Sequence, residues 1–364
     1  MHIVLISTPI GFLGSGRGGG VELTLNSLVT GLLAKGHKVD VVAPINSKLL
    51  EVNKKAKIYF VDGEEPKSWQ HQDYYSSVNI SDNSLLTGMI EKAIALGKKA
   101  DVILNLSYDW LPIWMTLNIN IPIAHIISMG SESFVISNLI SNVYSKYPKN
   151  FAFHSKIQAS DYPFIENPVV IGNGFELDNY IFQDCKNGPL GWVGRVAPEK
   201  GLEDAAYVAN VLGEKLNVWG IVQDESYALK IEKLFSPESL VWKGFLETDK
   251  LQKELGTCRA LLNTPKWNEA YGNVVVEALA CGVPVVAYRR GGPSEIIEHG
   301  KTGYLAKPDD KEELINFLKI INEIDRKNCR KWVENNASSN IFAIKVVNWL
   351  NTVIKEYQSH NFSK

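Results

Sequence analysis

The sequence predicts an α/β protein built from two doubly wound, Rossmann-like domains that face a cleft. Two observations lead to this fold class. Short apolar runs alternate with amphipathic helical stretches along almost the whole chain, which is typical of parallel sheets covered by helices. The chain also has 364 residues, which favours two domains of ordinary size over a single hydrophobic core.

The first domain is expected over residues 1–168. It opens with the apolar run HIVLIS, which has the length of a buried parallel strand and precedes a glycine-rich loop and a helix. Polar segments that contain glycine or proline separate the later runs. Helices are expected at 21–35 and 85–98, and strands at 2–7, 38–43, 58–61, 101–106, 121–128 and 151–155, the last being the final strand of this half.

The second domain is expected over residues 175–340, and its pattern again alternates apolar runs with helical stretches. A Gly-Val-Pro turn separates one of its helices from the apolar run that follows. Strands are expected at 190–196, 217–222, 240–242, 261–263 and 285–288, and helices at 202–212 and around 274–279. A further helix is expected at 341–357, beyond the second domain.

The loop after the first strand, GFLGSGRGGG, fits the letters of a dinucleotide-binding fingerprint at Gly14, Gly16 and Gly19. In that fingerprint the glycines follow the strand directly, whereas about half a dozen residues intervene here. The second strand also ends without an acidic residue, at the sequence APIN. A dehydrogenase is therefore not favoured, and a glycine-rich surface turn stays open as the alternative to a ligand-binding loop.

Composition excludes several function classes. The net charge of -2 provides no basic excess that would hold nucleic acid or an anionic membrane, although local basic patches stay open. Hydrophobic residues make up 45% of the chain and charged residues 21%, which is typical of a globular protein. The scattered cysteines, with no C-x-x-C pair, indicate neither a zinc site nor a disulfide framework.

The N-terminal sequence MHIVLIS has no basic region before its short apolar run, so it predicts a first strand rather than a signal peptide. No apolar run is long enough to cross a bilayer. We therefore expect a cytoplasmic protein, with no indication of peripheral membrane contact. The sequence does not set the oligomeric state.

Two carboxylates frame a loop and the start of a helix in the second half. Glu269 lies just before the helix, and Glu277 lies about two turns further on, on a face that drifts little over two turns. Between them Gly272 permits close backbone approach, and the first-turn N–H groups from Tyr271 to Val274 can bind an anion. Carboxylates suit hydroxyls rather than phosphate. A phosphate flanked by two polyols describes a nucleotide sugar.

A basic loop follows the first strand of the second half, with the sequence GRVAPEKG. Arg195 offers a planar fork suited to phosphate, and Lys200 offers a mobile point charge. At the carboxyl end of a strand the two can neutralise a diphosphate leaving group. An exposed basic loop is the alternative, and the joint presence of the glutamate pair favours function.

The spacing from Glu269 to Glu277, together with the Arg195 to Lys200 loop, resembles retaining glycosyltransferases of family 4, which have the GT-B fold. The resemblance covers nearly the whole chain and is most specific in the second half. It implies that the helix at about 341–360 crosses back to the first domain. It also implies catalytic roles for Arg195, Lys200 and Glu269, with Glu277 on the ribose.

The same resemblance implies the remaining donor contacts. The glycines that open the first helix would face the donor phosphates, and the segment after the strand at 240–242 would border the base through backbone atoms. The donor-binding residues implied in this way are Gly19, Gly20, Tyr271, Gly272, Asn273, Val274, Glu277, Lys243 and Gly244.

The acceptor side is expected at the carboxyl ends of two strands of the first half. Tyr108, Asp109 and Trp110 leave one strand, where aromatic rings can stack on a sugar or pack the next helix. Ser128 and Met129 end another strand, and many family members have a histidine in place of Ser128. A lone histidine among apolar strand residues, His125, predicts a core residue rather than a catalytic one.

The resulting prediction is a retaining glycosyltransferase that moves a hexosyl group from a nucleotide diphosphate sugar, UDP-linked in our expectation, to a hydroxyl acceptor. Polysaccharide, glycolipid and small-glycoside synthesis all stay open. We expect no cofactor and no metal, since Arg195 and Lys200 supply the positive charge. The alternatives are a catalytically silent nucleotide-sugar-binding protein, which Ser128 motivates, and a nucleotide-sugar epimerase.

Overall fold

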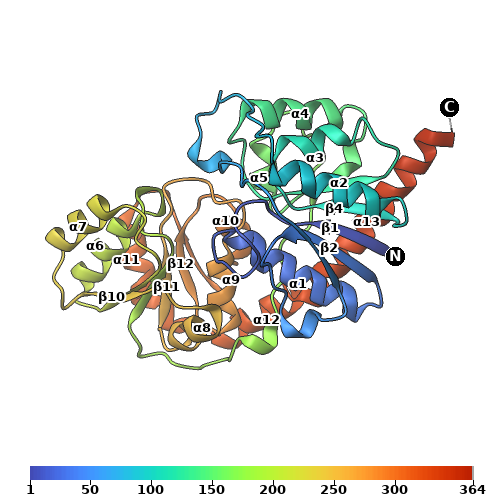
Figure 1. Ribbon diagram of the computed structural model, residues 1–364. Helices are drawn as coiled ribbons and strands as arrows, with labels where there is room; N and C mark the ends of the chain where they lie inside the picture. Colours follow the sequence, from blue (N-terminus) through green and yellow to red (C-terminus); the bar gives the residue numbers. More distant parts are fainter. Residues whose placement is uncertain (363–364) are drawn as a thin grey trace. The chain divides into compact units, whose positions relative to one another are not determined.

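The computed structural model describes residues 1–362, which form two compact units. The first unit comprises Met1–Phe175 together with the helix that begins at Ser339, and the second comprises Glu176–Ser338 (Figure 1). Each unit has one parallel sheet and flanking helices, so the predicted α/β class with two doubly wound sheets is confirmed.

The first sheet has seven parallel strands in the order β3-β2-β1-β4-β5-β6-β7. Its strands are β1 (His2–Ile6), β2 (Lys38–Pro44), β3 (Lys57–Val61), β4 (Val102–Asn105), β5 (Ile123–Ile127), β6 (Phe151–Phe153) and β7 (Val169–Val170). The helices of this unit are α1 (Gly20–Ala34), α2 (Leu85–Gly97), α3 (Trp110–Met115), α4 (Phe134–Tyr144), α5 (Lys156–Ser160) and α13 (Ser339–Phe362), with 3₁₀ turns at Glu51–Asn53, Trp69–His71 and Pro148–Asn150.

Alternate side chains of the central strand β1 reach opposite faces of the sheet, as the two-residue period of a strand requires. Ile3 and Leu5 belong to a buried cluster with residues of α1 and α13. Val4 and Ile6 belong to a second buried cluster with residues of α2. Both faces of the sheet are therefore covered, which explains why its strands are continuous apolar runs in the sequence.

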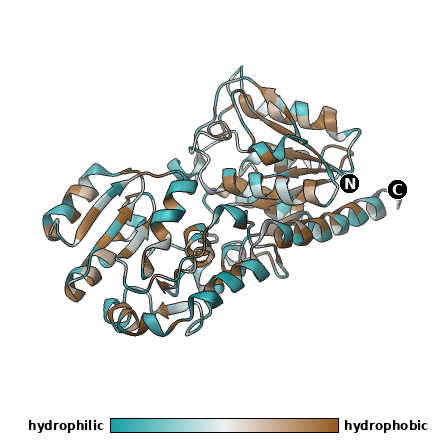
Figure 2. Cartoon of the chain, turned by 90° about the horizontal axis from the view of Figure 1, so that it is seen from below, coloured by the Kyte–Doolittle hydropathy of each residue, from teal (hydrophilic) through white to brown (hydrophobic). Residues whose placement is uncertain are grey.

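Helix α13 packs against α1 in the first unit, so the predicted return of the C-terminal helix is confirmed. A Cβ added at Gly31 of α1 would lie 2.4 Å from the Ser339 carbonyl oxygen and 2.7 Å from Ala343 Cβ. The two helices can approach this closely only because Gly31 has no side chain. In Figure 2 this long helix is coloured by both hydrophobic and hydrophilic residues along its length.

The strand at 151–155 is not the last of the first sheet, and that prediction is wrong. The two-residue strand β7 pairs with β6, Val169 beside Ala152 and Val170 beside Phe153. Two residues cannot display an alternating pattern, and Pro168 directly before them signals a turn. Periodicity therefore had nothing to detect at this edge of the sheet.

The second sheet has six parallel strands in the order β10-β9-β8-β11-β12-β13. Its strands are β8 (Leu190–Val193), β9 (Leu216–Trp219), β10 (Leu240–Gly244), β11 (Ala260–Asn263), β12 (Val285–Tyr288) and β13 (Gly303–Ala306), of which β13 was not predicted. The helices are α6 (Leu202–Leu212), α7 (Glu225–Leu234), α8 (Thr248–Gly256), α9 (Asn273–Ala280), α10 (Pro293–Ile296), α11 (Lys311–Ile320) and α12 (Arg326–Asn336), with 3₁₀ turns at Leu177–Asn179, Pro198–Lys200 and Ile321–Glu323.

Candidate functional site

Two loops meet at the carboxyl edge of the second sheet, because β8 and β11 are neighbours in it. The loop after β8 carries Arg195 and Lys200, and the loop after β11 carries Glu269. Lys266 N donates to the Glu199 carbonyl oxygen at 2.8 Å. Thr264 Oγ1 donates to the Gly201 carbonyl oxygen at 2.7 Å. The two loops are thus joined by hydrogen bonds into one surface.

Gly201 is the point of closest approach between these loops. Its φ of 64° lies in the left-handed region, and an added Cβ would lie 2.0 Å from the Thr264 carbonyl oxygen. Both the backbone conformation and the contact exclude a larger residue. The glycine therefore sets the position of the 3₁₀ turn that carries Lys200.

Lys200 and Glu269 form the centre of the candidate site. The Lys200 Nζ lies 2.5 Å from Glu269 Oε1 and 5.2 Å from the centroid of the Trp267 ring. The two side chains are 20% and 10% exposed, so the pair is largely withdrawn from solvent yet reachable. A lysine held between a carboxylate and an aromatic face can be drawn to an anion.

Arg195 lies on the same loop but makes different contacts. Its Nη1 donates to Gln223 Oε1 at 2.5 Å, and its Nη2 lies 3.4 Å from Glu199 Oε1. Gln223 belongs to the segment between β9 and α7. The structure thus places Arg195 on the same loop as Lys200 without a direct contact between its side chain and the Lys200–Glu269 pair.

The Glu269 backbone is held by a Gly-Gly pair that follows β12. Gly292 N donates to the Glu269 carbonyl oxygen at 2.7 Å. Gly291 has a φ of 63°, and a Cβ there would lie 2.4 Å from Glu269 N. Pro293 fills the space where a Cβ of Gly272 would project. These two glycines were not among the predicted site residues, although the sequence GGP after an apolar strand is a visible signal for close backbone approach.

Helix α9 begins directly after this loop, with Gly272 as its N-cap at a φ of 106°. Tyr271 precedes the cap, and Asn273 and Val274 form the first turn. The N-terminus of the helix carries the positive end of the helix dipole, which favours an anion there. The structure brings this helix start and Glu269 together as the sequence predicted from their proximity in the chain.

Glu277 is buried inside the second unit, with 8% of its surface exposed. It accepts a hydrogen bond from the Tyr180 hydroxyl at 3.2 Å, and burial raises the pKa of its carboxyl to about 7. Tyr180 lies 97 residues earlier in the chain and was not predicted. Near neutral pH this carboxyl can both donate and accept a hydrogen bond, which suits recognition of hydroxyl groups.

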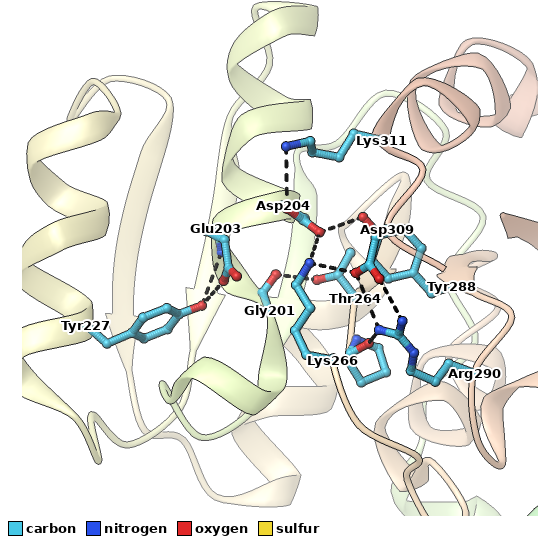
Figure 3. Close-up of polar contacts among 11 residues, drawn as sticks. Gly201, Glu203, Asp204, Tyr227, Thr264, Lys266, Tyr288, Arg290, Asp309 and Lys311 are labelled. Carbon is cyan, nitrogen blue, oxygen red and sulfur yellow. Dashed lines mark hydrogen bonds and ion pairs between the residues drawn. The ribbon is translucent and has the colours of Figure 1, made fainter. Parts of the chain in front are cut away.

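A network of charged side chains lies behind the Glu269 loop (Figure 3). Asp204 in the first turn of α6 is 5% exposed and pairs with Lys266, which also lies 2.9 Å from Asp309 Oδ1. Tyr288 at the end of β12 donates its hydroxyl proton to Asp204 at 2.6 Å. Arg290 Nη2 lies 2.8 Å from Asp309 Oδ2. The network connects the first turn of α6 with the loops after β11, β12 and β13.

The two predicted residues at the end of β10, Lys243 and Gly244, lie in different surroundings. The Gly244 carbonyl oxygen accepts from Gly220 N at 3.0 Å, at the carboxyl edge of the sheet. The Lys243 side chain instead lines a cavity with residues that precede the strands, such as Pro189 and Lys215. The structure therefore does not bring Lys243 to the Lys200–Glu269 pair.

In the first unit, the glycine-rich loop folds around the carboxylate of Glu22. Glu22 Oε2 accepts from Gly14 N at 2.7 Å, and Oε1 accepts from Gly18 N at 2.8 Å. Gly19 is the N-cap of α1 with a φ of 57°, and Gly20 is the first residue of that helix. The carboxylate organises the loop, and it was not predicted.

The predicted acceptor residues gather at the carboxyl ends of β4 and β5. The Tyr108 hydroxyl donates to the Gly130 carbonyl oxygen at 3.0 Å, which ties the two loops together. Asp109 is the N-cap of α3, where its Oδ1 accepts from Trp110 N at 2.7 Å, and burial raises its pKa to about 6. The residues that remain half-buried at this edge are Trp110, Ser128 and Met129.

His125 is a core residue, as predicted. It is 0% exposed, lies 3.2 Å from Asn105 Nδ2 and 2.8 Å from Thr116 Oγ1, and stacks on the Phe151 ring. Burial lowers the pKa of its imidazole to about 3, so the ring is neutral at physiological pH. The histidine fills the sheet interior and does not reach the edge where Ser128 lies.

Within residues 1–362, no helix has both the length and the hydropathy that a bilayer crossing needs. The same part of the chain contains no group of three or more histidine, cysteine, aspartate or glutamate side chains arranged to hold a metal ion.

Residues 188–339 match the family model described as glycosyl transferases group 1. The sulfoquinovosyl transferase SQD2 of Arabidopsis thaliana is 36% identical over 132 residues, which are 35% of this chain and 25% of that protein. The capsular polysaccharide biosynthesis glycosyltransferase CapM of Staphylococcus aureus is 26% identical over 202 residues, 50% of this chain and 52% of that protein. The matches thus span about a quarter and about half of these relatives.

A solved structure of HepE from Anabaena, in complex with UDP and glucose, shares the fold. Its TM-score is 0.74 at 17% identity, and the alignment covers 96% of this chain and 99% of that one. At this identity the likeness concerns the fold.

Proposed function

We propose that this chain, which the family match over residues 188–339 and the fold support as a GT-B glycosyltransferase, is a retaining enzyme of family 4. It moves a hexosyl group from a UDP-linked sugar to a hydroxyl acceptor. The UDP in the HepE complex motivates the choice of base for this chain. The acceptor belongs to polysaccharide, glycolipid or small-glycoside synthesis.

The contact between Lys200 and Glu269 carries the proposal. Two loops that are 69 residues apart in sequence place a cation and a carboxylate 2.5 Å apart beside the start of α9. A donor diphosphate competes for Lys200 and draws it from Glu269, because a doubly charged phosphate attracts an ammonium more strongly than one carboxylate does. The released Glu269 then accepts from the hydroxyls of the transferred sugar.

The reaction breaks the bond between the anomeric carbon and the phosphate oxygen. Negative charge develops on the leaving diphosphate, and Lys200, Arg195 and the α9 N-terminus stabilise it as fixed positive groups. The acceptor oxygen attacks the anomeric carbon from the face that the diphosphate leaves, and its proton passes to the departing phosphate. No metal is needed for this charge balance. Glu277 binds the ribose hydroxyls from its buried position.

The first unit supplies the acceptor contacts in this proposal, through Tyr108, Asp109, Trp110, Ser128 and Met129. Gly19 and Gly20, at the start of α1, are candidates for backbone contacts to phosphate. The four free cysteines suit a reducing compartment, so we place the enzyme in the cytoplasm.

A panel of nucleotide sugars, followed by thermal shift, identifies the donor, because a ligand that binds only the folded state raises the melting temperature. The chosen donor is then incubated with candidate acceptors, and transfer is measured for the wild type and for Glu269→Ala. Glu225→Ala, an exposed glutamate on α7, is the matched control. We expect transfer to fall at least about a hundredfold in Glu269→Ala only.

Two other outcomes would replace this proposal. Tight donor binding without turnover on any acceptor would make the chain a silent nucleotide-sugar-binding protein, the alternative that Ser128 in place of the family histidine motivates. Conversion of the free donor to its epimer without an acceptor would indicate an epimerase. Mass spectrometry separates transfer from hydrolysis, and NMR of the sugar ring detects epimerisation.

A further inference from the structure

The second unit contains a cavity of about 660 Å³ at the amino edge of its sheet, away from the loops that carry Lys200 and Glu269. The cavity wall is formed by the segments that lead into β8, β9 and β11, together with side chains of β9 and β10. Lys200 and Glu269 follow the strands that these segments precede. The strands have four or five residues, so roughly 13 Å of sheet separates the two edges.

Cationic side chains dominate this wall. Lys186, Lys215, Lys243 and Arg259 line the cavity against the single carboxylate of Glu214. Arg259 Nε donates to Glu214 Oε2 at 2.6 Å, so that carboxylate is neutralised by the arginine. Among the described residues, none of the three lysines has a carboxylate within ion-pair distance. Three positive charges therefore face the cavity without a counter-charge.

Asn217 gives this cavity a buried polar group. It is the second residue of β9, is 9% exposed, and lines the cavity from the sheet face. Its side-chain amide is not among the buried polar groups without a partner, so solvent reaches it through the cavity. The amide is therefore a hydrogen-bonding group that a ligand in the cavity can contact.

The wall is also held in place by its own contacts. Leu190 N donates to the Lys215 carbonyl oxygen at 2.9 Å, and Arg259 N donates to the Pro189 carbonyl oxygen at 3.0 Å. Arg259 Nη1 donates to the Leu318 carbonyl oxygen at 3.1 Å. The backbone at Lys215 and Arg259 is thus fixed by hydrogen bonds, Lys243 lies on β10, and the exposed Lys186 lies in the segment before β8.

We propose that this cavity is a second anion site, which binds a small soluble phosphate ester or pyrophosphate. Three lysines supply the charge for at least two negative groups, and the Asn217 amide donates a hydrogen bond to a phosphate oxygen. The volume falls within the range of small-molecule pockets, which favours a compact ligand over a polymer. The site is separate from the donor site and stands whether or not the chain transfers sugars.

Equilibrium dialysis with inorganic pyrophosphate tests this site, at a constant ionic strength of about 0.1 M so that screening does not vary. We expect two equivalents bound per wild-type chain, one at each edge of the sheet. Lys186→Gln/Lys215→Gln removes two charges from the cavity and weakens one equivalent at least about tenfold, while Arg195→Gln/Lys200→Gln weakens the other.

Lys230→Gln/Lys233→Gln on α7 is the matched control, since it removes two exposed lysines of the same unit that do not line the cavity. It should leave both equivalents unchanged. Asn217→Asp keeps the shape of the side chain and places a carboxylate in the cavity, so it should abolish the second equivalent. Unchanged binding in Lys186→Gln/Lys215→Gln, or equal weakening in the control, overturns the proposal.

Discussion

The two sheets each place a loop after their first strand, and these loops use charge in opposite ways. In the first unit the loop after β1 closes on itself, because Glu22 of the adjoining helix accepts from Gly14 N and Gly18 N. In the second unit the loop after β8 sends Lys200 outward to Glu269 on a neighbouring loop. The same topology therefore yields one loop that is held by a carboxylate of its own adjoining helix and one whose charge can be exchanged for a ligand.

The largest effect on activity is expected from removing the charge of Lys200. Lys200→Ala should lower kcat/KM by about a thousandfold, the cost of losing a preorganised group that stabilises a leaving diphosphate. Lys233→Ala, at an exposed position of α7 in the same unit, should leave it unchanged. The measurement is steady-state transfer with the donor chosen by thermal shift. Equal rates for Lys200→Ala and the wild type would contradict the view that the loop after β8 offers its charge to a ligand.

A smaller effect is expected from the glycine that sets the Lys200 turn. Gly201→Ala should destabilise the second unit by about 2–4 kcal/mol, since the new Cβ meets the Thr264 carbonyl oxygen in addition to the cost of a positive φ. Gly213→Ala is the matched control: its φ of 67° is similar, and nothing lies within 4 Å of the added Cβ. It should lose only about 1 kcal/mol. Urea unfolding followed by tryptophan fluorescence measures both, and similar losses would contradict a steric role for Gly201.

The buried carboxyl of Glu277 should lower the stability of the protein as pH rises, whereas a carboxyl group with a lowered pKa does the opposite. The folded pKa of Glu277 is raised to about 7, so the folded state binds the proton more tightly than the unfolded chain. The stability that the protonated carboxyl contributes is fully present below about pH 4.5 and is lost as pH rises through 7. Glu277→Gln should therefore be more stable than the wild type by about 3 kcal/mol at pH 8, and by only about 1 kcal/mol at pH 5.

Unfolding curves at both pH values measure this difference without any ligand. Glu225→Gln on the exposed face of α7 provides the control and should show no pH-dependent difference from the wild type. A stability gap for Glu277→Gln that stays constant from pH 5 to pH 8 would show that packing, rather than ionisation, sets it.

The smallest effect on stability is expected from changing Glu22, which holds the loop after β1 in the first unit. Glu22→Gln weakens the charge-assisted hydrogen bonds to Gly14 N and Gly18 N, and should cost about 1 kcal/mol of stability. Hydrogen exchange at residues 14–18 should become faster. Glu51→Gln, a largely exposed glutamate of the same unit, should change neither quantity. Slow exchange in Glu22→Gln would mean that the glycine backbone holds its shape without the carboxylate.

Sequence pattern predicted the elements that have clear periodicity and failed where an element was too short to have any. The helix at 202–212 and the strand at 285–288 have the predicted bounds, and both are buried along one face or throughout. The edge strands β7 and β13 were missed. β7 has two residues, and β13 begins at Gly303, a residue that weakens any strand pattern.

The candidate site shows the same limit at the level of single side chains. The sequence pattern selected Glu269, Lys200 and the start of α9 as candidates by residue type and spacing, and the structure brings Lys200 and Glu269 into contact. Tyr180 as the partner of Glu277 was not, because a contact across 97 residues depends on packing that no local pattern records. The sequence places Lys243 correctly on a strand end, yet its side chain lines the cavity at the other edge, since direction depends on which face of the strand it occupies.

The first unit is the first to be synthesised but the last to be completed, because it includes helix α13. Phe342, Val346 and Trp349 belong to the same buried cluster as β1 and α1, so the first unit lacks part of its interior until the ribosome has made these residues. The second unit, which ends at Ser338, is already whole by then. The apolar residues of α1 that α13 covers therefore stay exposed in the nascent chain while the second unit folds. During that interval a chaperone can bind them, or they can cause aggregation.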